Sequence, residues 1–297
     1  MSRLLSLLWL SVCLTAYATS AAPMAMPSPN PRAPSPVTKG PLAPASPVGP
    51  RSNYSLLAFD ALNDGVPNRI LSLQTTATVP TLPPSMGWIS AWPALDTVTP
   101  GGRIAEGNIL HQPIIKWGNI CNGPRDQYSS FKSWYAYPLW FSQEADSQPP
   151  GSRPNPHCHL GPDLLQVNPG DTLTMSINAV NYDGHTASWR QTVTDNRTGQ
   201  SSTLGYDIPD PTLFPSRVQF DIEFKTDDNQ QFTNQMSPLI FTNTAVTAAD
   251  PLGSCNLRPG SQPTTEQNVS STPVVSNDGR TCSWDQIAVY PITDYIP

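Results

Sequence analysis

Proline is the residue that most restricts what this chain can fold into. The 297 residues include 35 Pro and 18 Gly, and one or the other interrupts most windows of ten residues. Proline lacks a backbone N–H and breaks helices, so long helices are not expected. The sequence also shows almost no helical periodicity of its apolar residues. Short runs rich in Val, Ile, Thr and aromatic residues alternate with turn clusters instead. This pattern predicts an all-β fold, a sandwich of two packed antiparallel sheets.

The expected strands lie at 70–79, 87–95, 108–117, 132–140, 163–168, 172–181, 187–194, 201–205, 217–226 and 238–246, with a strand-like piece at 285–292. They divide the chain into a sandwich over 51–249 and a C-terminal extension over 250–297. The extension is too small to fold alone without its disulfide, so we expect it to pack on the edge of the sandwich.

The N-terminal segments predict secretion. Residues 1–22 combine Arg3, an apolar core and a small-residue cleavage zone, as a signal peptide does. Residues 23–50 are rich in Pro, Ser and Ala, which predicts a disordered arm that is either a propeptide or a linker. We therefore expect an extracellular protein.

The charge balance argues against some partners. The whole chain has 16 Lys+Arg and 22 Asp+Glu, a net charge of −6. Residues 1–50 hold three basic and no acidic residues, so the chain without them has 13 Lys+Arg and 22 Asp+Glu, a net charge of −9. An acidic, sparsely charged chain argues against nucleic acid and anionic membranes. No later stretch approaches the ~20 apolar residues of a membrane span. We expect a monomer without a cofactor.

The cysteines and sequons fit the secretory route. Four cysteines remain after the signal and allow three disulfide connectivities. We favour the local ones, Cys121–Cys158 and Cys255–Cys282. Glycosylation sequons stand at Asn53, Asn196 and Asn268.

Several segments, in the same order, resemble the eqolisin-type glutamic peptidases, fungal acid peptidases with a concanavalin A-like sandwich. These segments are TTATVP (75–80), SAWPALD (90–96), NILHQPIIKWGN (108–119), FKSWYAYPLW (131–140), VNPGDTLTMSI (167–177), TVTDNRTGQSS (192–202) and FTNTAVTA (241–248). The resemblance covers roughly 75–248 and implies the same fold.

The chemistry of that family needs a glutamate and a glutamine facing each other on the concave sheet, where they activate water and stabilise an oxyanion. By the resemblance, Lys116 stands at the glutamine position and Gln219 at the glutamate position. A neutral amide cannot act as the base, so the inherited mechanism is not expected. A shifted pair, Gln112 with Glu223, is the alternative catalytic pair. Otherwise Lys116 forms an ion pair with Asp221 or Glu223.

Aromatic residues offer a binding surface for peptides or sugars. Alternation places Trp134 and Trp140 on one side of a strand and Tyr135 and Tyr137 on the other, so one set is core and one can line a groove with Trp117. His157 and His159 flank Cys158 and could form half of a metal site, although the remaining histidines lack ligand spacing. We expect no metal.

These observations predict a secreted eqolisin-like protein, inactive as a peptidase, that binds a peptide, a glycan or a cell-wall component on its concave face. The alternative is an acid hydrolase, first a peptidase using Gln112 and Glu223, then a glycosidase using Asp221 and Glu223. A structural wall protein without a specific ligand is the third class.

Overall fold

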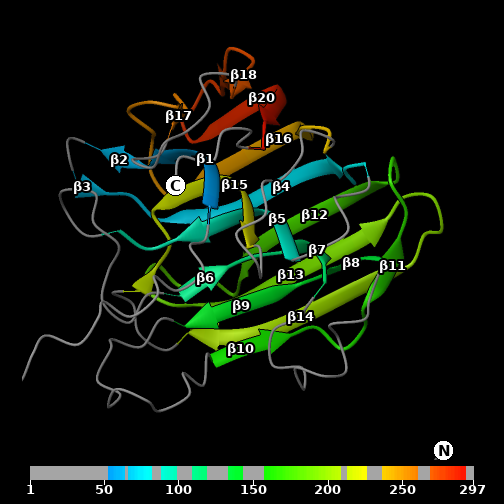
Figure 1. Cartoon of the computed structure of the whole chain (residues 1–297). Helices are drawn as coiled ribbons and strands as arrows, with labels where there is room; N and C mark the ends of the chain where they lie inside the picture. Colours follow the sequence, from blue (N-terminus) through cyan, green and yellow to red (C-terminus); the bar gives the residue numbers. More distant parts are fainter. Residues whose placement is uncertain are drawn as a thin grey trace, which may run out of the picture. The chain divides into compact units, whose positions relative to one another are not determined.

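A computed structural model describes residues 53–63, 66–81, 88–98, 109–118, 133–142, 157–208, 213–225, 236–259 and 268–291. The expected signal peptide and the Pro-rich arm lie outside these residues, as does Cys121. The described residues form two large antiparallel sheets (Figure 1), which confirms the expected all-β sandwich.

The first sheet, called sheet I, has ten strands in the described part of the chain, in the order β10-β9-β6-β5-β15-β1-β17. A branch leaves β5 through β7 and β8 to β11. Its strands are β1 (Asn53–Asp60), β5 (Trp88–Asp96), β6 (Ile109–His111), β7 (Ile114–Trp117), β8 (Trp134–Tyr137), β9 (Leu139–Ser142), β10 (His157–Leu160), β11 (Leu165–Val167), β15 (Arg217–Lys225) and β17 (Arg258–Pro259).

The second sheet, called sheet II, has eight described strands in the order β14-β13-β12-β4-β16-β20-β18, with β19 paired to β20. Its strands are β4 (Ile70–Thr78), β12 (Thr172–Val180), β13 (Ala187–Asp195), β14 (Ser201–Ile208), β16 (Leu239–Ala248), β18 (Val269–Ser270), β19 (Val274–Val275) and β20 (Thr281–Val289). A small ribbon joins β2 (Leu62–Asn63) to β3 (Val66–Pro67).

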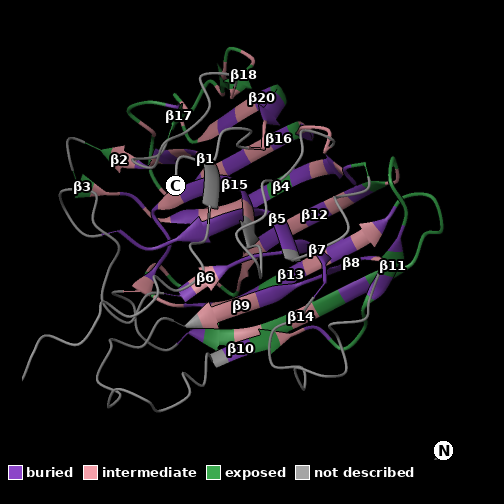
Figure 2. Ribbon diagram, in the orientation of Figure 1, coloured by how far each residue is buried: buried purple, intermediate pink, exposed green. Residues whose placement is uncertain are grey.

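Alternation along the strands explains how the sheets pack. In β13, every second residue from Ala187 to Asp195 is buried and those between are more exposed. Because side chains of a strand point to opposite faces in turn, one face of the strand enters the core and the other meets solvent. Figure 2 shows the same banding along β4, β12 and β16.

The core lies between the two sheets. Phe220 of sheet I meets Phe241 of sheet II with 5.0 Å between ring centroids. Phe59 and Trp284 make a similar contact at 5.6 Å. Aromatic pairs at this spacing add to the area that they bury, so the two sheets are held together by large apolar contacts.

Two prolines divide strands that the sequence predicts as continuous. The expected strand 108–117 is split at Gln112 and Pro113 into β6 and β7, and 132–140 is split at Pro138 into β8 and β9. A proline cannot donate to the ladder, so pairing is interrupted at each position. The Gln112 backbone N–H still donates to the Leu139 carbonyl oxygen, at 2.8 Å, and this keeps the two broken strands side by side.

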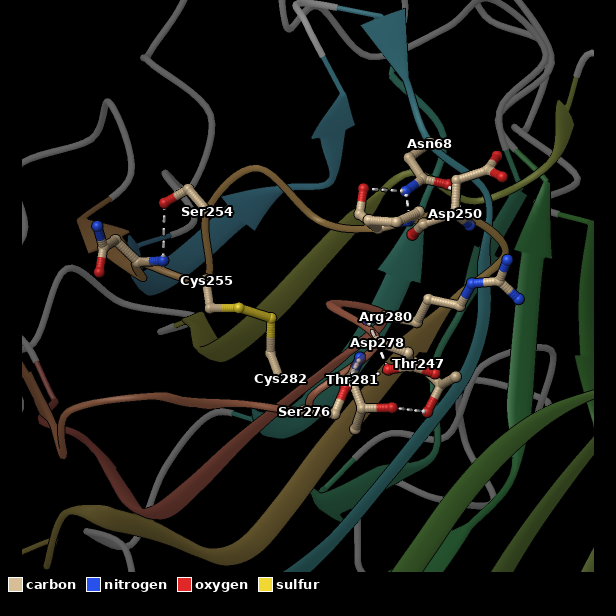
Figure 3. The surroundings of a disulfide bond; sticks show 12 residues. Asn68, Thr247, Asp250, Ser254, Cys255, Ser276, Asp278, Arg280, Thr281 and Cys282 are labelled. Atoms are coloured by element: carbon tan, nitrogen blue, oxygen red, sulfur yellow. Dashed lines mark hydrogen bonds between the residues drawn. A yellow bond between two sulfur atoms is a disulfide. The ribbon is translucent and has the colours of Figure 1, made fainter.

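The C-terminal extension adds strands to both sheets. β17 pairs with β1 in sheet I, and β20 pairs with β16 in sheet II. The expected disulfide Cys255–Cys282 is present and ties the segment before β17 to β20 (Figure 3). Cys158 is also disulfide-bonded. The extension is therefore built into the edge of the sandwich.

The sequons differ in setting. Asn196 is exposed in the turn after β13, Asn268 is half-buried before β18, and Asn53 begins β1. Among the described residues, no helix is long and apolar enough to cross a membrane.

Candidate functional site

The site is built on the face of sheet I that points away from sheet II, called the outer face. The inner face contributes residues such as Ile89, Ala91 and Ile222 to the main core. The outer face carries a second, smaller apolar cluster that includes Trp92, Ala94 and further residues. Polar side chains lie among these residues, in rows that run across the strands.

The first of these, called the lysine row, consists of Tyr135, Lys116, Ser90 and Glu223. Lys116 lies opposite Tyr135 on one side and Ser90 on the other, and Ser90 lies opposite Glu223. The Lys116 ammonium donates to Ser90 Oγ at 2.5 Å. Lys116 is only 9% exposed, and Glu223 is half-buried.

Burial dominates the ionisation of Lys116. Loss of water around the ammonium lowers the pKa of Lys116 from 10.5 to about 8, and the negative charge of Glu223 opposes this shift. Glu223 is therefore the acidic group whose charge acts on Lys116, and the ion pair expected from the sequence stays a prediction. The amine still carries a proton at neutral pH.

The second, called the glutamine row, consists of Gln112, Ala94 and Gln219. Gln219 lies opposite Ala94. The pairs Leu95–His111 and Ala91–Ile115 are four residues apart on both strands, so they share one register in which Gln112 lies opposite Ala94 on the other side. Two amides thus flank one small residue, with their Cα atoms about 10 Å apart at ~4.8 Å per strand.

Asp96 holds one of these amides. Its Oδ2 accepts a hydrogen bond from Gln219 Nε2 at 2.8 Å, and its Oδ1 accepts one from the Thr97 backbone N–H at 2.7 Å. Asp96 is 1% exposed and Gln219 7%. The sequence interpretation missed Asp96, although it closes the SAWPALD segment on the same strand face as Ser90 and Ala94.

The register regroups the residues that the sequence singled out. The resemblance places Lys116 and Gln219 as a facing pair, yet Lys116 faces Glu223 across β5 and Gln219 faces Gln112. The structure does not bring the alternative pair, Gln112 and Glu223, together either. Their rows are four residues apart along β15, about 13 Å at ~3.3 Å per residue.

Between the two rows lies a third, made of Tyr137, Ile114, Trp92 and Asp221. Asp221 is opposite Trp92, and Ile114 is opposite Tyr137. Trp92 Nε1 and Tyr137 Oη are buried and have no hydrogen-bond partner among the described residues. Burial raises the pKa of Tyr137 far above its usual range, so its hydroxyl remains a donor.

Gln112 is a further polar side chain of the outer face. It is 6% exposed, and no hydrogen bond joins its side chain to any residue that the structure describes. A buried polar group without a partner costs about 1–3 kcal/mol. Trp92 and Tyr137 therefore leave two buried hydrogen-bonding groups unsatisfied beneath the outer face, and the Gln112 amide lies in the next row.

The aromatic residues divide as alternation predicts, but most of the large ones face inward. Trp117 and Trp134 belong to the main core, where their rings make an edge contact at 5.6 Å. Trp140 packs against the same core from its edge and stacks on His159 at 3.9 Å. Tyr135 and Tyr137 lie with the outer cluster. Among the expected groove residues, the two tyrosines are those on the outer face, which also carries Asp221.

A polar network that the sequence did not predict lies inside the sandwich. His111 Nδ1 shares a 2.5 Å hydrogen bond with Tyr206 Oη, which also accepts from Gln191 Nε2 at 2.6 Å. His111 is fully buried against the Trp189 ring. Burial lowers the pKa of His111 from 6.5 to about 3, so the imidazole is neutral at neutral pH.

Metal-ligand groups do not gather in the described part of the chain. His159 is exposed and stacks on Trp140, and no set of three or more His, Cys, Asp or Glu in the described residues is arranged to hold a metal ion.

Comparison with known proteins gives similarities of fold. No protein-family model matches the chain, and no curated protein matches it significantly. A solved structure of Scytalido-glutamic peptidase with a peptide-based transition-state analogue is 17% identical, covers 80% of this chain and 98% of its own, and has a TM-score of 0.44. SCP-B, an eqolisin peptidase in complex with the tripeptide Ala-Ile-His, is 14% identical over 82% of this chain and 100% of its own, with a TM-score of 0.45. These structures belong to the family that the sequence motifs resemble.

The chemistry open to the glutamine row follows from its functional groups. Each amide supplies two N–H donors and one carbonyl acceptor, and neither accepts a proton at a useful pH. The row is suited to hydrogen bonding with another amide or a hydroxyl group. The only carboxylate in contact with it that is described, Asp96, already accepts a hydrogen bond on each oxygen.

Proposed function

We propose that the protein is a secreted binding protein that holds an extended peptide on the outer face of sheet I and does not hydrolyse it. The observation that carries this proposal is the glutamine row, in which Gln219 lies across Ala94 from Gln112 and donates to Asp96. Where a glutamic peptidase would present a carboxyl group to water, this row presents a second amide.

Peptide is favoured over glycan by the direction of the aromatic rings. Sugar sites commonly use broad aromatic platforms, yet Trp117 and Trp134 pack in the main core. The glutamine row offers two amides, each with N–H donors and a carbonyl acceptor. These groups match the alternating N–H and C=O of an extended backbone.

Two features support export of the protein. The N-terminal segment has the composition of a signal peptide, and the Cys255–Cys282 disulfide is typical of an oxidising compartment. The acidic balance of the chain fits a role in an acidic medium, where protonation lowers its charge.

Binding can be tested by fluorescence anisotropy with a panel of labelled, unstructured peptides of eight to ten residues. The Gln112→Ala variant should bind its best peptide about tenfold more weakly, since one hydrogen-bonding group worth ~1.4 kcal/mol is lost. The matched control is Gln286→Ala, which removes an exposed glutamine of sheet II and should leave the affinity unchanged. Equal loss in both variants, or no binding at all, contradicts the proposal.

Hydrolysis is tested separately with denatured casein between pH 2 and 5. The wild-type protein should not cleave, because the glutamine row lacks a general base. The Gln219→Glu variant places a carboxyl group opposite Gln112, the pair that the family's chemistry needs, and slow cleavage is expected to appear in it. Cleavage by the wild-type protein would instead support the alternative reading, an acid peptidase.

A further inference from the structure

A cavity at the edge of sheet I extends the glutamine row toward the C-terminal extension. Its volume is about 580 Å³, and its lining includes Leu56, Ala58, Asp60, Arg217, Asn256 and Arg258. Ala58 lies opposite Gln219 on one side and opposite Arg258 on the other. The cavity therefore lies at the end of the row that begins with Gln112.

The charged residues that line the cavity are one aspartate and two arginines, so the cavity has a net positive charge. Arg217 Nε donates to Asp60 Oδ1 at 2.6 Å and Nη2 to Oδ2 at 3.4 Å, so these two groups neutralise each other. Arg258 is exposed, and no hydrogen bond or ion pair joins its side chain to a described residue. The chain as a whole has a net charge of −6, so the Arg258 guanidinium is a local positive charge on an acidic protein. Its planar fork matches a carboxylate with two parallel hydrogen bonds.

The wall that carries Arg258 is held in place. Cys255 is bonded to Cys282 of β20, and both residues are buried. The Gly253 N–H donates to the Leu62 carbonyl oxygen at 3.3 Å, and a Cβ at Gly253 would lie only 3.1 Å from that oxygen. Ser254 accepts from the Asn256 backbone N–H, in the segment that Figure 3 shows beside the disulfide. A fixed wall reduces the entropy lost when a ligand binds.

We propose that this cavity is a carboxylate-binding subsite for the peptide held on the outer face, with Arg258 as its direct contact. The inference rests on the proposed peptide-binding function. It adds that the bound peptide carries a negative charge, and it states where along the peptide that charge lies. Four strand spacings separate Gln112 from Arg258, about 19 Å, which an extended peptide spans with roughly six residues at ~3.3 Å each. The carboxylate of the ligand comes from an acidic side chain or from the peptide C-terminus. It lies roughly six residues along the peptide from the peptide residue that contacts Gln112.

The test uses three pools of random octapeptides without basic residues, offered to the immobilised full-length secreted protein at pH 6 and low salt. One pool has a free C-terminus and no acidic residue, one has a single internal Glu and an amidated C-terminus, and one has neither carboxylate. At least one carboxylate pool should be retained about tenfold more strongly than the neutral pool. The pool that is retained identifies the source of the carboxylate. The preference should shrink as salt is added.

Three variants decide the outcome. Arg258→Gln should abolish the preference while the neutral pool still binds, and Arg258→Lys should keep part of it, since the charge remains without the planar fork. Arg280→Gln, an exposed arginine on the other side of the disulfide, should behave as the wild type. Binding of all pools without preference, or a preference that survives in Arg258→Gln, overturns the subsite and leaves the proposed function intact. Failure of every pool to bind overturns both.

Discussion

The two faces of sheet I are made by the same strands, yet they carry different kinds of residue. In β15, Val218, Phe220 and Ile222 are fully buried and apolar on the inner face. Their neighbours Gln219 and Asp221 are also buried, at 7% and 3% exposed, on the outer face. Burial alone therefore does not distinguish the faces. The inner face packs against the apolar residues of sheet II, whereas on the outer face polar side chains lie among the residues of a smaller apolar cluster.

The contrast extends to the buried ionisable groups. His111 on the inner face and Lys116 on the outer face both lose solvation, and in each the charged form is disfavoured. His111 is bonded to Tyr206 within a closed core, while Lys116 is bonded to Ser90 near the half-buried Glu223. The two residues should affect stability in separate pH ranges, which allows each face to be tested alone.

The largest effect is expected from His111. Its pKa is lowered from 6.5 to about 3, so between these values the unfolded chain binds a proton that the folded protein does not. The free energy of unfolding should fall as the pH drops through this range, by up to about 5 kcal/mol for the full shift. His111→Phe keeps the ring against Trp189 and should be less stable than the wild type at pH 7 but more stable near pH 3. Urea unfolding at both pH values measures this. A stability difference that does not change with pH contradicts the inner-face assignment of His111.

The next effect concerns packing of the inner face. Phe220→Ala removes a fully buried ring that contacts Phe241, and it should lower the free energy of unfolding by about 4 kcal/mol. Peptide binding by the protein that remains folded should be unchanged, since the outer face keeps its residues. Thermal unfolding and anisotropy on the same sample check both halves. If the folded variant binds the peptide more weakly than the same concentration of folded wild-type protein, the two faces are coupled.

The smallest effect is expected on the outer face. The folded pKa of Lys116 is about 8 against 10.5 in the unfolded chain, so wild-type stability should rise as the pH increases from 8 to 10.5. Lys116→Met removes the desolvation cost and should raise the free energy of unfolding at pH 7 by about 2 kcal/mol, less than the full shift because Ser90 loses its hydrogen-bond donor. The difference from wild type should vanish toward pH 10.5. A variant that is less stable at pH 7 would show that the Lys116 charge stabilises the fold.

The sequence was sufficient for most of the fold. Strands at 70–79, 172–181 and 217–226 are observed within one residue of prediction, because their alternation is clear and turn residues bound them. β1 was missed. It has apolar residues on both faces, Leu57 and Phe59 inward and Leu56 and Ala58 outward, so no alternation marks it.

The candidate site was less accessible to sequence reasoning. The residue types were identified, but the pairing of Lys116 with Glu223 and of Gln112 with Gln219 depends on a register set by β5 between them. Register is determined by hydrogen bonds between strands far apart in sequence, and a shift of a few residues regroups every row. The role of Asp96 likewise follows only once β5 and β15 are seen to be neighbours.

The position of β1 has a consequence for how the protein is made. Asp60 of β1 meets Arg217, 157 residues later in the chain, and Thr75 of β4 reaches Thr242, 167 residues later. At ~5–20 residues per second, β1 leaves the ribosome roughly 10–30 s before its partner exists. Neither sheet can close around its first strand during most of translation. Folding should be slow and largely post-translational, with the apolar β1 segment exposed to chaperones until the C-terminal half arrives.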